Sequence, residues 1–256
     1  MAMRDINGAL TLSATDLSNF LSCRHRTALE MAAARGKRKR PHFHDPLLEV
    51  LFKRGLDHEK SYIHSLESAG RRTLDLAAVK NPDAAFAQTL DAMRLGADVL
   101  VQAALRGERW YGRPDVLLRV DAPSALGGWS YEVADTKLAR ETRAGTILQL
   151  GLYSELLGVA QGRLPEQFYV VTPEPEGPIQ TYRVDHYAAY LRLIRAQIQE
   201  TVAQDDSDVA AANYPEPVDH CDVCPWSSEC SKNMYMSPEK WLVRFFIPDL
   251  KDGLQF

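Results

Sequence analysis

Apolar residues recur at steps of three and four over several long stretches of the chain, a spacing typical of amphipathic helices. It predicts helices over residues 13–35, 46–69, 82–101, 141–158 and 186–203. Shorter apolar runs predict strands over residues 113–120, 129–138, 167–172 and 179–184. The stretch after residue 206 has no clear period and is expected to be loop-like. This order of elements predicts an α/β fold, with a mixed central sheet flanked by helices and a helical lobe before it.

Composition and length agree with one soluble domain covering residues 1–256, because 45% of the residues are hydrophobic and 25% are charged. No run approaches the roughly eighteen uncharged apolar residues of a membrane helix. A membrane is therefore not an expected partner. The first residues lack the basic and apolar parts of a signal peptide, which makes the cytoplasm the expected compartment.

The net charge of −4 does not by itself indicate a nucleic-acid-binding protein. Residues 35–40, however, include five cations, and we call this stretch the basic segment. Together with Arg24 it can supply salt-dependent contacts to a phosphate backbone. The other interpretation is a solvated loop.

The four cysteines point to a metal site or a redox site, since a disulfide framework is not expected in the cytoplasm. Cys221, Cys224 and Cys230 form a C-x2-C-x5-C pattern, and Cys23 is the one cysteine that remains. Four thiolates suit tetrahedral zinc or a [4Fe–4S] cluster. Either group would join the N-terminal helix to the C-terminal region as a clasp. A zinc site that uses His220, and a redox-active CxxC, stay open as alternatives.

A second group of residues combines carboxylates with a lysine. Asp135 and Lys137 are two residues apart in a predicted strand and therefore lie on the same face. Asp115 lies near the start of the strand before it. If the two strands are antiparallel neighbours, both carboxylates converge and favour a cation between them. Such a site suits Mg²⁺ or Mn²⁺, with His58 and the Thr136 carbonyl as further ligands.

The helix after these strands carries Gln149 and Tyr153, which are four residues apart and therefore share a face. Both side chains can hydrogen-bond to a phosphate or a base, and a tyrosine can also stack on a base. The alternative is that Tyr153 belongs to the core and Gln149 to its rim.

Taken together, these residues resemble the PD-(D/E)xK nuclease superfamily, in particular the iron–sulfur members of its RecB-like branch. Similar proteins are the exonucleases of CRISPR spacer acquisition and the AddB nuclease domain. The resemblance covers roughly residues 11–235 and is carried by Gly55-x-x-His58-Glu59, Gly112-Arg113-Pro114-Asp115, Asp135-Thr136-Lys137, Gln149-x-x-x-Tyr153 and the cysteine spacing.

The resemblance implies a restriction-endonuclease-like core with a helical lobe and an iron–sulfur clasp. It implies catalysis by Asp115, Asp135 and Lys137, with Mg²⁺ or Mn²⁺ held by His58, Asp115, Asp135 and Thr136. It also implies a [4Fe–4S] cluster on Cys23, Cys221, Cys224 and Cys230. The residues expected to bind DNA are Gln149, Tyr153, Arg113, Arg24, Lys37 and Arg38. We expect the lobe at 11–108, the core at 109–205, the cysteine region at 206–235 and a tail at 236–256.

The expected function is that of a metal-dependent exonuclease on single-stranded or frayed DNA, acting in repair, recombination or CRISPR adaptation. The chain has no G-x-x-x-x-G-K-[ST] motif, so a helicase would have to be a separate partner. One alternative is a non-catalytic DNA-binding module with a nuclease fold that serves such a helicase. Another is a zinc-clasped scaffold without nucleic acid.

Overall fold

A computed structural model describes residues 3–6, 8–41, 46–174, 178–213 and 216–235. Its centre is a six-stranded sheet in the order β10-β9-β8-β7-β4-β3. The strands are β3 (Thr73–Asp75), β4 (Val99–Val101), β7 (Val116–Val120), β8 (Ser130–Thr136), β9 (Gln167–Val171) and β10 (Ile179–Arg183). The β3–β4 and β8–β9 pairs are parallel and the other neighbours are antiparallel. The predicted mixed α/β class is confirmed.

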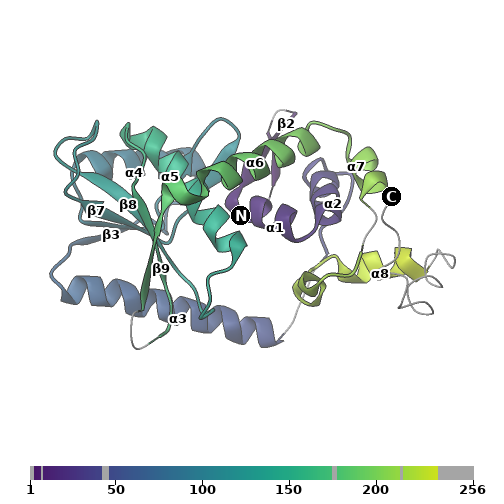
Figure 1. The fold of residues 1–256 in the computed structure, drawn as a ribbon, viewed down its shortest axis with the longest axis horizontal. Helices are drawn as coiled ribbons and strands as arrows, with labels where there is room; N and C mark the ends of the chain where they lie inside the picture. The colour runs from purple at the N-terminus through teal and green to yellow at the C-terminus, as the bar shows by residue number, and fades with distance from the viewer. Residues whose placement is uncertain (1–2, 7, 42–45, 175–177, 214–215, 236–256) are drawn as a thin grey trace.

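Helices cover both faces of this sheet (Figure 1). Helix α5 (Ala144–Gln161) connects the parallel strands β8 and β9 and packs on one face, and α3 (Pro46–Ser68) lies along the other. Strand β8 is therefore buried on both sides. Tyr131 and Val133 join the core under α5, whereas Ala134 packs with Tyr62 of α3. This alternation determines which face each polar residue at the end of β8 reaches.

A second, smaller sheet has the order β1-β2-β6-β5. Its strands are β1 (Arg4–Ile6), β2 (Ala9–Ser13), β5 (Leu105–Arg106) and β6 (Trp110–Gly112). The sequence pattern did not predict this sheet. Strand β2 leads directly into α1 (Ala14–Ser22), where Ser13 and Asp16 form a reciprocal capping box. Helix α1 in turn packs against α5 and joins the small sheet to the main core.

Two predicted helices differ from what their apolar spacing suggested, since one is interrupted and the other ends early. The predicted helix 13–35 is divided into α1 and α2 (Arg24–Ala34), because Cys23 is extended, with φ −162° and ψ 110°. Helix α4 (Pro82–Arg94) does not reach residue 101, since Gly96 adopts φ +70° and the chain turns into β4. Strands β3 and β4 are part of the main sheet, so the expected helical lobe at 11–108 needs correction.

The region after the main sheet is more helical than predicted. Besides the predicted helix α6 (Val184–Val202), it contains α7 (Asp206–Ala212), the short 3₁₀ helix η1 (Asp219–Val223) and α8 (Ser227–Tyr235). Helix α7 packs against α2, which brings the C-terminal region to the N-terminal helices (Figure 1). The expected tail at 236–256 lies outside the described residues. In the described parts of the chain, no helix is long and apolar enough to cross a membrane.

Candidate active site

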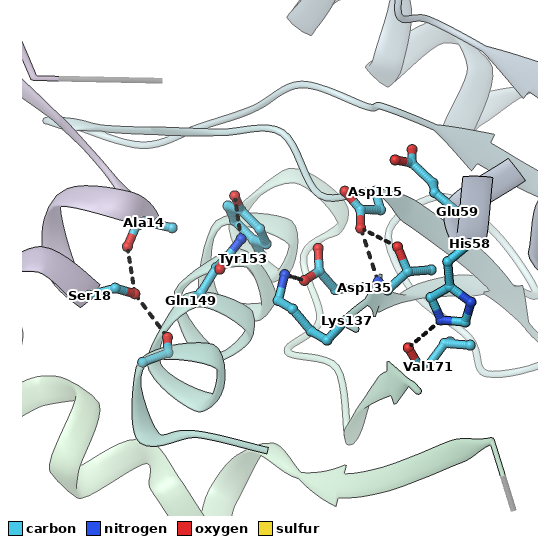
Figure 2. Close-up of polar contacts among 12 residues, drawn as sticks. Ala14, Ser18, His58, Glu59, Asp115, Asp135, Lys137, Gln149, Tyr153 and Val171 are labelled. Atoms are coloured by element: carbon cyan, nitrogen blue, oxygen red, sulfur yellow. Dashed lines mark hydrogen bonds and ion pairs between the residues drawn. The ribbon is translucent and has the colours of Figure 1, made fainter. Parts of the chain in front are cut away.

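Asp115 directly precedes β7, at the point where β7 and β8 bring the candidate residues together. The register pairs Val116 of β7 with Ala134 of β8, which places Asp115 beside the end of β8. One carboxylate oxygen of Asp115, Oδ2, accepts hydrogen bonds from the backbone N and the Oγ1 of Thr136, at 3.0 and 3.1 Å (Figure 2). The other oxygen, Oδ1, accepts from Nε2 of Gln102 at 3.3 Å. Asp115 is therefore held in one orientation by groups from two neighbouring segments.

Asp135 is the most deeply buried carboxylate of the site, with 1% of its surface exposed. It forms an ion pair with Lys137, two residues further along the chain. Burial and the nearby Asp115 carboxylate together raise the pKa of Asp135 to about 7, although Lys137 lowers it. Burial alone would lower the pKa of Lys137, but the carboxylates of Asp135 and Asp115 outweigh it, so this pKa is raised and the ammonium is stabilised. The site thus holds more negative charge than its single lysine balances.

Helix α3 presents His58 and Glu59 to the same region (Figure 2). Nε2 of His58 lies 3.1 Å from the Val171 carbonyl oxygen, so this ring nitrogen has a partner within the protein. Glu59 accepts a hydrogen bond from Nε2 of Gln102 at 2.8 Å. Burial and the Asp115 carboxylate raise the pKa of Glu59. The structure therefore brings a third carboxylate, Glu59, to the predicted pair.

Sequence reasoning did not select Glu59 or Gln102 as site residues. Glu59 did carry a signal, since it stands next to His58 in the quoted motif. Gln102 carried no such sequence signal, because its position in the site depends on strand β4, and the residues of β4 were predicted as the end of a helix.

Gln149 and Tyr153 lie on α5 and are joined by a hydrogen bond from Nε2 of Gln149 to the tyrosine hydroxyl, at 3.3 Å. The tyrosine is buried, and burial raises its pKa well above the ordinary value. Its ring packs on Gly112, where a Cβ would overlap it. Of the two side chains, the half-buried Gln149 is therefore the one presented to the site, and the predicted stacking role does not suit Tyr153 as it is placed.

The cations predicted to bind DNA have partners within the protein. Arg113 donates to the carbonyls of Leu76, Val79 and Gln102, which gives it a structural role in the loops around the site. The other pairs are Arg24 with Gln197, Lys37 with Asp205 and Asp206, and Arg38 with Glu229. The structure therefore pairs Lys37 and Arg38 with α7 and α8, while residues 36–40 remain exposed to solvent.

Cys23, Cys221, Cys224 and Cys230 line one cavity of about 120 Å³, together with Arg26 and His220. All four cysteines are free thiols. Burial, followed by the neighbouring cysteines, raises the pKa of Cys230 to about 11. Beneath them, the buried Trp226 donates from Nε1 to Glu30 of α2 at 2.8 Å. Four soft donors around one cavity have the chemistry that zinc or an iron–sulfur cluster requires.

Within the described ranges, no group of three or more His, Cys, Asp or Glu side chains has the arrangement of an assembled metal site. No family model matches the chain, and no curated protein matches it. The solved structure "Crystal structure of SSO0001" is similar at 15% identity, with 87% of this chain and 86% of that chain covered and a TM-score of 0.37.

Proposed function

We propose that this protein is a metal-dependent deoxyribonuclease of the RecB-like PD-(D/E)xK type, with an exonuclease action on single-stranded or frayed DNA ends. The observation that carries the proposal is the meeting of Asp115, Asp135 and Lys137 at the ends of two paired strands. The resemblance seen in the sequence implies these residues for catalysis, and α3 adds His58 and Glu59 beside them. On this proposal the main sheet with α3 and α5 is a restriction-endonuclease-like core.

The donor set fits Mg²⁺ or Mn²⁺. The buried Asp135 lies beside the Asp115 carboxylate, which adds to the rise in the pKa of Asp135, and a divalent cation would relieve the repulsion between the two. His58, Asp115, Asp135 and the Thr136 carbonyl are the residues proposed to hold it. When bound, the ion would polarise the phosphodiester and make a bound water more acidic.

The chain's own groups have separate tasks around that ion. The ammonium of Lys137 stays protonated beside Asp135, so it can orient the attacking water and offset charge that develops on the phosphate. Thr136 holds Asp115 in place through two hydrogen bonds. Gln149, whose amide is positioned by Tyr153, is proposed to contact the DNA.

The four cysteines are proposed to hold a [4Fe–4S] cluster, with zinc as the other candidate. Their cavity has four thiols and one nearby cation, Arg26, which suits a cluster with a net negative charge. The cluster would be structural, since it joins α2 to the C-terminal region away from the carboxylates.

The test is cleavage of end-labelled single-stranded DNA in Mn²⁺, with circular single-stranded DNA beside it. We expect the linear strand to be shortened from an end and the circle to survive. Lys137→Met and Asp115→Asn should each lose at least about 100-fold in rate, as expected when a group that acts in the transition state is removed. Lys80→Met, at an exposed lysine, is the control that should cleave normally.

Full cleavage by purified Lys137→Met would exclude the proposed role of the lysine. Salt-sensitive DNA binding without cleavage in either metal would favour the alternative, a non-catalytic DNA-binding module that serves a partner helicase. Cleavage of the circular DNA would support nuclease activity but exclude a purely exonucleolytic action.

A further inference from the structure

Gln102 has an unusual backbone conformation. With φ +52°, it is the only non-glycine residue with a positive φ among the described residues. Residues other than glycine, asparagine and aspartate rarely adopt a positive φ, and such backbone conformations concentrate at functional sites. Gln102 directly follows β4, and the conformation turns its side chain back toward α3 and β7.

The surroundings hold Gln102 in this conformation from both sides. Its backbone N donates to the Asp115 carbonyl at 2.8 Å. Its own carbonyl accepts from Nε and Nη2 of Arg113, at 3.1 and 2.7 Å. The backbone of Gln102 is thereby fixed relative to Asp115, the residue directly before β7.

The Gln102 amide reaches two carboxylates at once. Nε2 lies 2.8 Å from Oε1 of Glu59 and 3.3 Å from Oδ1 of Asp115, so each amide hydrogen has an acceptor. An amide carries no charge, and it therefore holds the two carboxylates together without neutralising them. No described residue donates a hydrogen bond to the second oxygen of Glu59, which leaves that oxygen available to a cation.

We propose that Gln102 is a positioning residue that makes Glu59 the third carboxylate of the cation site by holding it against Asp115. This inference rests on the proposed metal-dependent function and adds Glu59 and Gln102 to its site. A lysine or arginine at position 102 would hold the carboxylates equally close, but it would supply the positive charge that the site keeps for the metal ion.

The test is Mn²⁺ binding to the full chain without DNA, measured by electron paramagnetic resonance of free Mn²⁺. Gln102→Met keeps the size of the side chain and removes both N–H donors. Gln102→Gly also removes them and relaxes the positive φ, so it covers the case in which the methionine variant does not fold. In both variants and in Glu59→Gln we expect the Kd for Mn²⁺ to rise about 10- to 100-fold, as for other groups that orient metal ligands.

Two comparisons separate positioning from a general structural effect. Gln199→Met changes another half-buried glutamine, on α6, and should bind Mn²⁺ like the wild type. In the double variant Gln102→Met/Glu59→Gln, the loss should be no larger than in either single variant, because the amide acts through Glu59. Rate measurements should show a lower kcat with little change in KM for DNA.

Unchanged Mn²⁺ affinity in both Gln102 variants would overturn the inference, as would additive losses in the double variant or a wild-type chain that binds no Mn²⁺. If the wild type binds Mn²⁺ in a Gln102-dependent way and cleaves no DNA, the proposed nuclease function fails and this inference stands. If the wild type cleaves and the Gln102 variants bind and cleave normally, only the inference fails.

Discussion

Two glycines from the quoted motifs, Gly112 and Gly55, stand in opposite surroundings. A Cβ on Gly112 would lie 2.7 Å from Cδ1 of Tyr153, closer than such atoms approach. A Cβ on Gly55 would meet nothing within 4 Å. Gly112 is therefore required by the packing of Tyr153, whereas the folded chain places no such demand on residue 55.

Gly112→Ala should destabilise the protein by about 1–3 kcal/mol, because the buried Tyr153 ring must move to admit the methyl group. Urea unfolding measures this loss. Tyr153→Leu in the same chain should remove most of the extra cost, since the branched side chain leaves room for it. Gly128→Ala, where a Cβ meets nothing within 4 Å, is the matched control. If Gly112→Ala were as stable as the wild type, Tyr153 would not be fixed as described.

Gly55→Ala should have the opposite effect on stability. It lies within α3 and has open space around it, so alanine should stabilise the chain by about 0.5–1 kcal/mol through helix propensity. The same urea experiment measures it. If the variant is more stable and binds single-stranded DNA more weakly, the space at Gly55 is needed by the ligand and not by the fold. A loss of stability would show a contact that the structure lacks.

The sequence reveals some residues of the site and hides others for a physical reason. Asp115, Asp135 and Lys137 are found by pattern because strand alternation and antiparallel pairing are local rules. Gln102 is found only in three dimensions, since its role comes from a left-handed turn and from contacts to two segments distant in sequence.

At the scale of elements, three long helices and four strands of the main sheet were predicted correctly, whereas the small sheet and the shortest strands were not. Helices α3, α5 and α6 and strands β7 to β10 lie where the pattern placed them, within a few residues. Strands of two or three residues, such as β4 and β5, are too short to show a period. Leu100 and Val101 also continue the helical spacing of α4, and only pairing with β7 makes them a strand.

The basic segment shows how pairing between elements changes an electrostatic prediction. Asp206 of α7 accepts from Arg35 at 2.9 Å and from Lys37 at 2.6 Å. Burial raises the pKa of Asp206, but these hydrogen bonds outweigh it, and the net pKa is lowered. A group with a lowered pKa in the folded state stabilises the fold above its unfolded pKa and loses that effect as the pH falls through the folded value.

Asp206→Asn should therefore be less stable than the wild type at pH 7, because it loses these ion pairs. The loss should be only about 1–2 kcal/mol, because Lys37 is half exposed and solvent screens its charge. The difference should shrink below about pH 4, near the ordinary aspartate pKa. Thermal unfolding from pH 7 to pH 3 measures both effects. Asp208→Asn, an exposed change in the same helix, should leave stability within about 0.5 kcal/mol of the wild type. A pH-independent difference would contradict the ion-pair explanation.

At the scale of the whole molecule, the cysteines connect parts of the chain that the sequence separates widely. Cys23 interrupts the first helical stretch between α1 and α2, and the other three come from η1, the turn after it and α8. The buried Trp226–Glu30 hydrogen bond joins α2 to this region without any metal, and Arg40 of the basic segment pairs with the same Glu30. The proposed clasp would thus reinforce a contact that side-chain packing already makes.

Removing the proposed cluster should consequently loosen one end of the molecule and leave the main sheet folded. Anaerobically purified wild type should absorb broadly near 400 nm and contain about four irons, as a [4Fe–4S] protein does. Cys230→Ser should lose that absorbance and expose residues 216–235 to limited proteolysis, while circular dichroism keeps the α/β signal. Ser22→Ala, next to Cys23, is the control that should retain the iron. A colourless wild type with about one zinc would replace the cluster by a zinc clasp of the same geometry. A wild type with neither metal would mean that packing and side-chain pairs, such as Trp226–Glu30 and Arg38–Glu229, hold the two ends together.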